Sequence, residues 1–237
     1  MAIGAPQQME MAADCTDIFP QQQIMVKQEF AFMELCACEA KNRYRISVPD
    51  GEKEGAVFAY INEESECFER ICCSKARSLT LLVHQGASKD GPIIQTMTKP
   101  FSCGGPCPCM RPSFQVYAGA VGQNQIGSIE DPCKCCVMDQ QILDANGGAM
   151  FSTQGSICQI GICCPCCGSV DFEVTKAGSK VATISKRPMD CGECLQKTNR
   201  FIIDFEKVSD AKEKRMIFAS AMLLDLEYFE EQKNSNN

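Results

Sequence analysis

The chain has 237 residues, 45% of them apolar, which is enough to bury a substantial core in one large β domain or two smaller ones. Its formal charge is −7, with 30 acidic residues against 23 basic ones. This balance argues against a nucleic-acid partner, because nucleic-acid binders present a basic face. It leaves a membrane partner open, since covalent lipid attachment needs no net positive charge.

The first 22 residues predict a flexible leader. They are rich in glutamine and proline, show little periodicity, and contain neither the basic start nor the apolar run of a secretory signal. We therefore expect a protein that is not secreted and whose thiols are free in a reducing compartment.

Short β segments separated by turn residues follow the leader. The turns are marked by Pro-Asp-Gly, Asp-Gly-Pro and Asn-Gly-Gly triplets, and no βαβ alternation or glycine-rich phosphate loop is present in the sequence. Short strands at this spacing predict an antiparallel barrel or sandwich. The expected strands are residues 24–29, 43–47, 56–61, 79–84, 93–98, 114–118, 125–129, 141–144, 170–174, 180–184 and 200–205.

The chain ends in a predicted helix over about 210–229. Ser209 is the expected N-cap, and the stretch from Met216 to Phe229 lacks glycine and proline and is rich in alanine, methionine and leucine. A bilayer span needs about 20 apolar residues, and this run is shorter and contains Asp225 and Glu227. We therefore expect a helix buried inside protein rather than a membrane anchor.

Histidine is too scarce for most nucleophilic catalysis. The one histidine, His84, lies in an apolar run and is expected to be structural. Any Ser–His–Asp or Cys–His system would therefore have to use His84 as its base. The sequence therefore predicts a protein that is not a classical enzyme.

Nineteen cysteines gather in clusters, which suggests metal, lipid or packing roles. Zinc sites typically use two Cys-x₂-Cys halves, and Cys191-Gly-Glu-Cys194 is one such half. However, the clusters hold more thiols than one tetrahedral ion uses, and contiguous cysteines beside apolar residues are typical of acyl acceptors. We therefore favour covalent palmitate and keep Zn²⁺ as the alternative. The main clusters are Cys103, Cys107 and Cys109, then Cys133, Cys135 and Cys136, then Cys163, Cys164, Cys166 and Cys167.

Several ordered motifs together resemble the phospholipid scramblase family over nearly the whole chain. They are Cys67-Phe-Glu-Arg-Ile-Cys-Cys73, Lys99-Pro-Phe-Ser-Cys103, Cys166-Cys-Gly-Ser-Val-Asp-Phe-Glu-Val174 followed by Ile184-Ser-Lys186, and Leu223-Leu-Asp-Leu-Glu-Tyr-Phe-Glu230. The resemblance implies a mainly β, tubby-like fold: a single antiparallel barrel of about twelve strands that encloses the hydrophobic C-terminal helix. We expect this domain to span residues 23–230, followed by a flexible tail, 231–237.

The resemblance also implies a function. Members of this family are associated with ATP-independent, calcium-triggered, bidirectional movement of phospholipids between leaflets. It implies membrane association at the cytoplasmic face, most naturally of the plasma membrane, through palmitate on the first cluster: Cys103, Cys107 and Cys109. In this chain the Cys-Cys-Pro-Cys-Cys run stands in the later cluster instead, so Cys163, Cys164, Cys166 and Cys167 are acyl candidates too. Protein partners are not predicted.

The family's calcium segment is altered in this sequence. The matching stretch, residues 197–208, retains Asn199, Asp204 and Glu206 as the candidate Ca²⁺ ligands, but Lys197 and Arg200 stand where acidic residues are expected. Two other functions therefore stay open beside lipid movement. One is a palmitoyl-tethered adaptor or regulatory module without transport activity, and the other is a zinc-stabilised β protein.

Overall fold

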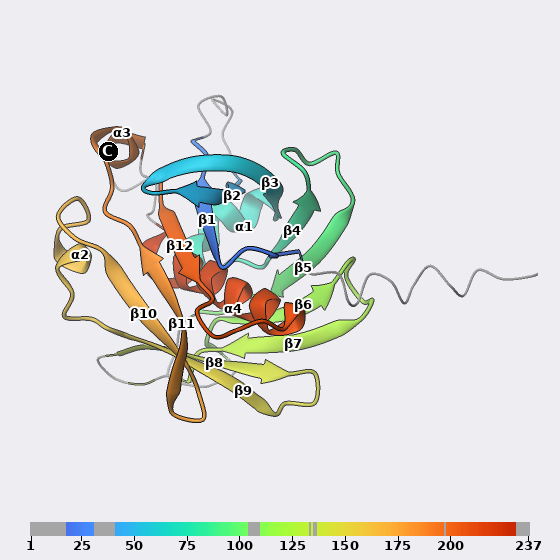
Figure 1. Cartoon of the computed structure of the whole chain (residues 1–237). Helices are drawn as coiled ribbons and strands as arrows, with labels where there is room; N and C mark the ends of the chain where they lie inside the picture. Colours follow the sequence, from blue (N-terminus) through green and yellow to red (C-terminus); the bar gives the residue numbers. More distant parts are fainter. Residues whose placement is uncertain are drawn as a thin grey trace, which may run out of the picture.

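Twelve antiparallel strands close into a single barrel around one long helix (Figure 1). The computed structural model describes residues 18–30, 41–103, 110–132, 134, 137–196 and 198–230. The predicted tail and most of the predicted leader lie outside this part of the chain. Within it, the mainly β architecture and the enclosed C-terminal helix are both confirmed.

Each strand pairs with its neighbour in sequence, and β12 closes the barrel by pairing with β1, where Val26 stands opposite Phe201. The closed sheet leaves no long unpaired edge. The strands are β1 (Gln23–Gln28), β2 (Arg43–Asp50), β3 (Lys53–Glu64), β4 (Leu79–Gln85), β5 (Ile93–Lys99), β6 (Ser113–Ala118), β7 (Gln125–Glu130), β8 (Val137–Asp144), β9 (Ala149–Ser156), β10 (Val170–Lys176), β11 (Ser179–Lys186) and β12 (Arg200–Asp204).

Alternating side chains place one face of each strand against the core. In β10, Val170, Phe172 and Val174 are buried, whereas Asp171 and Glu173 between them are exposed. This is the period-two pattern of a sheet with one wet face. Among the strands of the described residues, β9 alone was not predicted from the sequence; its inward positions include a threonine and a glycine in place of large apolar residues.

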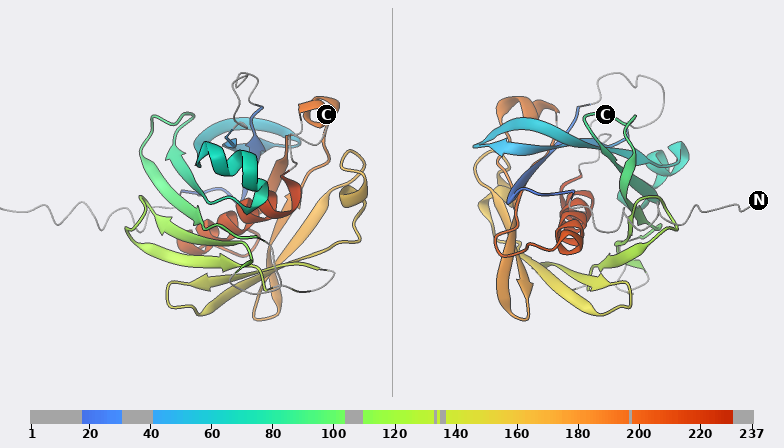
Figure 2. Two further views of the ribbon diagram at one scale, coloured as in Figure 1. Left: turned by 180° about the vertical axis from the view of Figure 1, so that it is seen from behind. Right: turned by 45° about the vertical axis from the view of Figure 1, so that its right-hand side comes forward.

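Helix α4 (Ala211–Leu224) runs through the barrel and continues as a π-helical turn, Asp225–Phe229 (Figure 2). Its residues are buried almost all round, as predicted for a core helix; Phe218 and Leu223, for example, have no exposed surface. The N-cap is Asp210, whose carboxylate accepts a bond from the Glu213 amide at 2.9 Å, so the prediction of Ser209 was wrong by one residue. Among the described residues, no helix is long and apolar enough to cross a membrane.

The barrel has two different ends. At one, which we call the hairpin end, short turns join each even-numbered strand to the next odd-numbered strand, and glycines such as Gly147 and Gly178 adopt positive φ. At the other, longer connections carry the helices α1 (Cys67–Cys73), α2 (Ile160–Cys163) and α3 (Cys191–Gln196). Helix α4 begins at the hairpin end and finishes at this second end.

Candidate functional site

The second end of the barrel carries the cysteines that the structure describes, and we call it the cysteine end. Six connections leave and re-enter the sheet there, and 18 of the 19 cysteines belong to them in sequence; only Cys15 precedes the barrel. The free cysteines whose surroundings are described are exposed, apart from the half-buried Cys73. The topology therefore brings the described cysteines of four different connections to one end of the barrel.

The same end exposes an unusual amount of apolar surface. Ten of the twelve large apolar side chains that are exposed among the described residues lie there, and only Ile93 and Val121 lie at the hairpin end. The largest exposed fractions are 74% for Phe68, 70% for Ile160 and 87% for Leu195, one on each of the three short helices. Apolar patches of this kind mark surfaces that contact a partner or a membrane.

Apolar side chains and thiols share the same short segments. Phe101 precedes the exposed Cys103, and Ile160 and Ile162 lie beside the exposed Cys163 on α2. Of the predicted acyl acceptors, Cys103, Cys163 and Cys166 are accessible thiols. Cys107 and Cys109 lie outside the described residues. Acylation itself stays a prediction.

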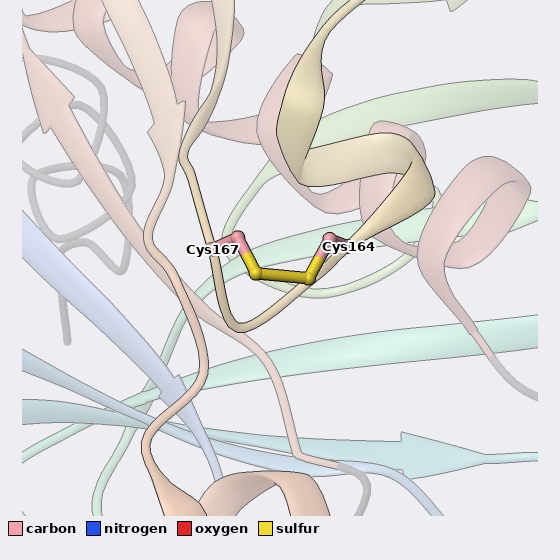
Figure 3. Close-up of a disulfide and its surroundings, with 2 residues drawn as sticks. All are labelled: Cys164 and Cys167. Atoms are coloured by element: carbon pink, nitrogen blue, oxygen red, sulfur yellow. A yellow bond between two sulfur atoms is a disulfide. The ribbon is translucent and has the colours of Figure 1, made fainter.

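Two of the predicted acyl acceptors are bonded to each other. Cys164 and Cys167 form a disulfide, which corrects the expectation of free thiols at these positions (Figure 3). The physical reason is a tight turn: the Cys167 amide donates to the Cys164 carbonyl at 2.9 Å, which brings the two Cα atoms to 5.3 Å, within the range that a disulfide spans. Neither sulfur can accept an acyl chain while this bond is intact.

The candidate calcium ligands do not converge. Asn199 is buried at the cysteine end, where its amide donates to Asp225 and to the Phe229 carbonyl. Asp204 ends β12 at the hairpin end, five residues away, so about 16 Å of extended chain separates the two. Glu206 lies beside Asp204 but accepts a bond from Thr183 at 2.6 Å and pairs with Lys180 at 3.0 Å. Among the described side chains, no group of three or more His, Cys, Asp or Glu residues is placed to hold a metal.

The C-terminal turn of α4 anchors a buried polar cluster beneath the cysteine end, which sequence reasoning missed. Asp225 accepts bonds from the Tyr44 hydroxyl at 2.7 Å and from the Asn199 amide at 2.8 Å. Burial raises the pKa of Asp225 to about 6. The acidic residues were visible in the sequence, but their partners lie up to 181 residues away, so no local spacing could have identified them.

Ion pairs extend this cluster around the helix end. Arg77 binds Glu63 at 2.9 Å and Glu230 at 2.6 Å, and all three are largely buried. Lys99 donates to the carbonyls of Lys75 and Arg77, and burial lowers its pKa to about 8. These bonds join the end of the C-terminal helix to β2 and to the segment before β4.

The class of protein is defined by a closed twelve-stranded barrel that is filled by its own C-terminal helix and bears its described free thiols at one end. The family model described as Scramblase matches residues 3–231, so the chain belongs to the scramblase family. The predicted family and fold are thus both confirmed.

Individual relatives are moderately similar. Human phospholipid scramblase 1 is 25% identical over 213 residues, which cover 88% of this chain and 63% of the relative. Phospholipid scramblase 2 from Bos taurus is 24% identical, with 88% and 68% covered, and human phospholipid scramblase family member 5 is 25% identical, with 81% and 68% covered. The chain thus spans about 63% of the length of the first of these relatives.

Proposed function

We propose that this chain is a membrane-associated, scramblase-type protein that moves phospholipids between leaflets without ATP and that contacts the membrane with its cysteine end. The observation that carries the proposal is the coincidence, on one end of a barrel of this family, of exposed apolar side chains and exposed thiols. Family membership supports phospholipid as the substrate, and the activity needs no covalent chemistry.

Attachment by palmitate fits this surface. A single acyl chain gives only marginal, reversible membrane binding, so stable attachment takes two signals. Cys103 and the pair Cys163 and Cys166 lie on different connections of the same end, so chains attached to them would enter one leaflet together. We propose the cytoplasmic leaflet of the plasma membrane, where acylation of reduced thiols takes place.

Lipid movement is the direct test. The purified full chain is reconstituted into vesicles that contain a fluorescent phospholipid, and the fraction accessible to a membrane-impermeant quencher is followed with time. We expect accessibility to rise from about half, the outer leaflet alone, toward the whole population. Accessibility that stays at the protein-free level at every protein-to-lipid ratio contradicts the proposed activity.

Calcium is a variable in the same assay. A calcium response that acts through residues 197–208 should disappear in the Asp204→Asn/Glu206→Gln variant, because these side chains supply the remaining carboxylates. Both are already bound to neighbouring side chains, Asp204 to Gln23 and Glu206 to Lys180, so a cation would have to displace these partners. A response that persists in the variant removes this segment as the calcium site.

A tethered adaptor is the second candidate, and the filled barrel favours it. Helix α4 occupies the interior, and its buried residues pack against the inward faces of the strands. Lipid headgroups therefore have no open route through the described part of the barrel. Hydroxylamine-sensitive acyl labelling of wild type, together with no lipid movement, would establish the adaptor; loss of label in Cys103→Ser or Cys163→Ser/Cys166→Ser would locate the tether.

A further inference from the structure

A cavity of about 460 Å³ opens at the hairpin end, beside the start of α4. It lies between the segment that precedes β1, strand β3, the β4–β5 hairpin and the residues that follow β6. Its volume falls within the usual range of small-molecule sites, about 300–1,000 Å³. Most of its wall is apolar and includes Phe58, Ile93 and Ile94. This cavity is at the opposite end from the proposed membrane contact, and the proposed function does not use it.

The segment before β1 is fixed in place where it borders the cavity. Phe19, which follows the lining residue Ile18, has no exposed surface and packs on Phe218 of α4 with 5.0 Å between the ring centroids. The Phe19 carbonyl accepts a bond from Lys214 Nζ at 2.6 Å, and the Phe19 ring meets that of Phe58 edge to face at 6.3 Å. The wall is therefore formed by packing within the protein itself, and a ligand would not have to order it on binding.

A buried cation lines the cavity. Arg215 of α4 is 3% exposed, and among the described residues that line the cavity it alone carries a charge. Its Nη1 donates to the Ile94 carbonyl at 2.7 Å, and the same carbonyl accepts a bond from the Gly119 amide at 3.1 Å. The guanidinium is thus held against the wall. Its planar fork of N–H donors matches the two oxygens of a carboxylate, and the attraction between opposite charges is stronger away from bulk water.

Gln21 adds a second polar group to the cavity wall. Its side-chain oxygen is buried and has no hydrogen-bond partner among the described residues. A buried polar atom without a partner costs free energy, so a ligand that bonds to it gains affinity. Turning the amide over places its NH₂ group at the same position, so Gln21 can accept from a protonated acid or donate to an anion. A carboxyl group therefore suits both Gln21 and Arg215.

We propose that this cavity binds a single-chain carboxylic acid of the fatty-acid class. The alkyl chain would lie against the apolar wall, and the carboxylate would pair with Arg215 and Gln21. Apolar walls with a few polar groups that fix orientation are typical of small-molecule sites. The charge of Arg215 favours an acid over a neutral molecule of the same length. The ligand would enter from the aqueous phase, because the cavity opens at the end that points away from the proposed membrane contact.

Calorimetric titration tests the ligand class. The full chain is titrated with decanoate and, separately, with 1-decanol, which has the same chain length and no charge. We expect one decanoate per chain and an affinity at least about tenfold above that of 1-decanol, because hydrogen bonds to a charged partner are the stronger ones. Arg215→Gln keeps a donor but removes the charge, so this preference should disappear. No saturable decanoate binding to wild type, or an unchanged preference in Arg215→Gln, overturns the proposal.

Two tryptophan variants locate the site. Ile93 and Val121 are both exposed at the hairpin end, but only Ile93 lines the cavity. Ile93→Trp should narrow the cavity and weaken decanoate binding at least about tenfold, the loss that corresponds to about 1.4 kcal/mol, whereas Val121→Trp should bind as wild type does. Equal binding by these two variants overturns the proposal.

Adsorption to the exposed apolar surface of the cysteine end is tested separately. Phe68→Ser/Ile160→Ser/Leu195→Ser removes that surface and should leave decanoate binding unchanged. Loss of binding in this variant would place the ligand at the cysteine end and overturn the proposal. Thermal melts show that each variant is folded, so that loss of binding is not loss of structure. None of these readouts depends on lipid movement.

Discussion

Arg77 bridges two largely buried carboxylates at the cysteine end. Its guanidinium bonds to Glu63 on β3 and to Glu230 after α4, and it is 4% exposed. Burial by itself would raise the pKa of Glu63, but the bonds from Arg77 outweigh it and the pKa lies below its usual value. Glu63 therefore stays ionised in the interior, and it depends on Arg77 for compensation.

Arg77→Ala should be strongly destabilising. It leaves two carboxylates without their buried cation, and breaking such a pair from one side costs about 3–5 kcal/mol. Arg187→Ala is the matched control, because Arg187 pairs with Glu52 on the surface, where an ion pair is worth about 1 kcal/mol at most. The free energy of unfolding in urea measures both. Equal losses in the two variants would contradict the role given to Arg77.

Glu227 should make stability depend on pH. Burial, and then the neighbouring Asp131, raise its pKa to about 9, although Arg111 and the Tyr228 hydroxyl act in the opposite direction. The folded protein thus keeps a proton that the unfolded chain loses above its usual pKa of 4.5. Its contribution to stability is fully present below pH 4.5 and declines as the pH rises to about 9.

Glu227→Gln should flatten this decline, because an amide keeps the neutral form at every pH. The free energy of unfolding, measured at several values between about pH 6.5 and pH 9, gives the slope. This window lies above the pKa of Asp225, which is about 6. Burial raises that pKa too, so Asp225 also lowers the stability as the pH rises, but it does so at lower pH. Parallel slopes for wild type and Glu227→Gln would show that Glu227 does not titrate in the folded state over this range.

At the scale of elements, the packing of α4 against β7 depends on a glycine. A Cβ added at Gly127 would lie 2.6 Å from Met216 Cε of α4 and closer still to the backbone carbonyl of Leu143 on β8. The methionine side chain can move, but the carbonyl belongs to the sheet and cannot. Gly127 therefore sets how closely the helix and the strand approach.

Gly127→Ala should lower the free energy of unfolding by about 1–3 kcal/mol, the usual cost of forcing extra volume into a packed core. Gly192→Ala in α3 is the control, because its added methyl would meet only the Asp190 side chain at 3.3 Å and alanine favours helix. Thermal melts of the oxidised proteins report both. A Gly127→Ala protein as stable as Gly192→Ala would mean that the helix has room to shift.

An element could be predicted where neighbouring residues in the sequence determine it, and could not where contacts with distant residues do. Eleven strands were predictable because their alternating apolar residues reflect burial directly, as in β10. Strand β9 was not, because Thr153 satisfies its inward position by a hydrogen bond to Ser220 of α4, 67 residues away. The short helices were not predicted either, since α1 and α3 expose large apolar side chains that give no amphipathic pattern.

At the scale of the whole molecule, the two ends of the barrel should differ in membrane binding. Phe68→Ser/Ile160→Ser/Leu195→Ser removes exposed apolar surface from α1, α2 and α3. Each such side chain contributes about 1.5–3 kcal/mol when fully buried, so partial insertion of three predicts at least a roughly tenfold weaker partition of the unacylated chain into phospholipid vesicles. Vesicle co-sedimentation measures this partition.

Ile93→Ser/Val121→Ser is the control at the hairpin end, and it should bind vesicles as wild type does. Neither set of substitutions should lower the melting temperature by much, because the side chains are exposed in the folded protein. Equal binding by the two variants would show that the cysteine end does not face the bilayer.

Helix α4 runs from one end of the barrel to the other, and this direction sets the orientation of a molecule that is attached to a membrane. Its fourteen helical residues rise about 21 Å. A barrel held by its cysteine end would stand with this helix near the bilayer normal, and its glycine turns would project more than about 20 Å above the headgroups. Acceptor dyes in the lipid would then quench a donor on α1 far more than one placed beside Gly147. Any soluble protein that recognised those turns would be held at one constant height above the membrane.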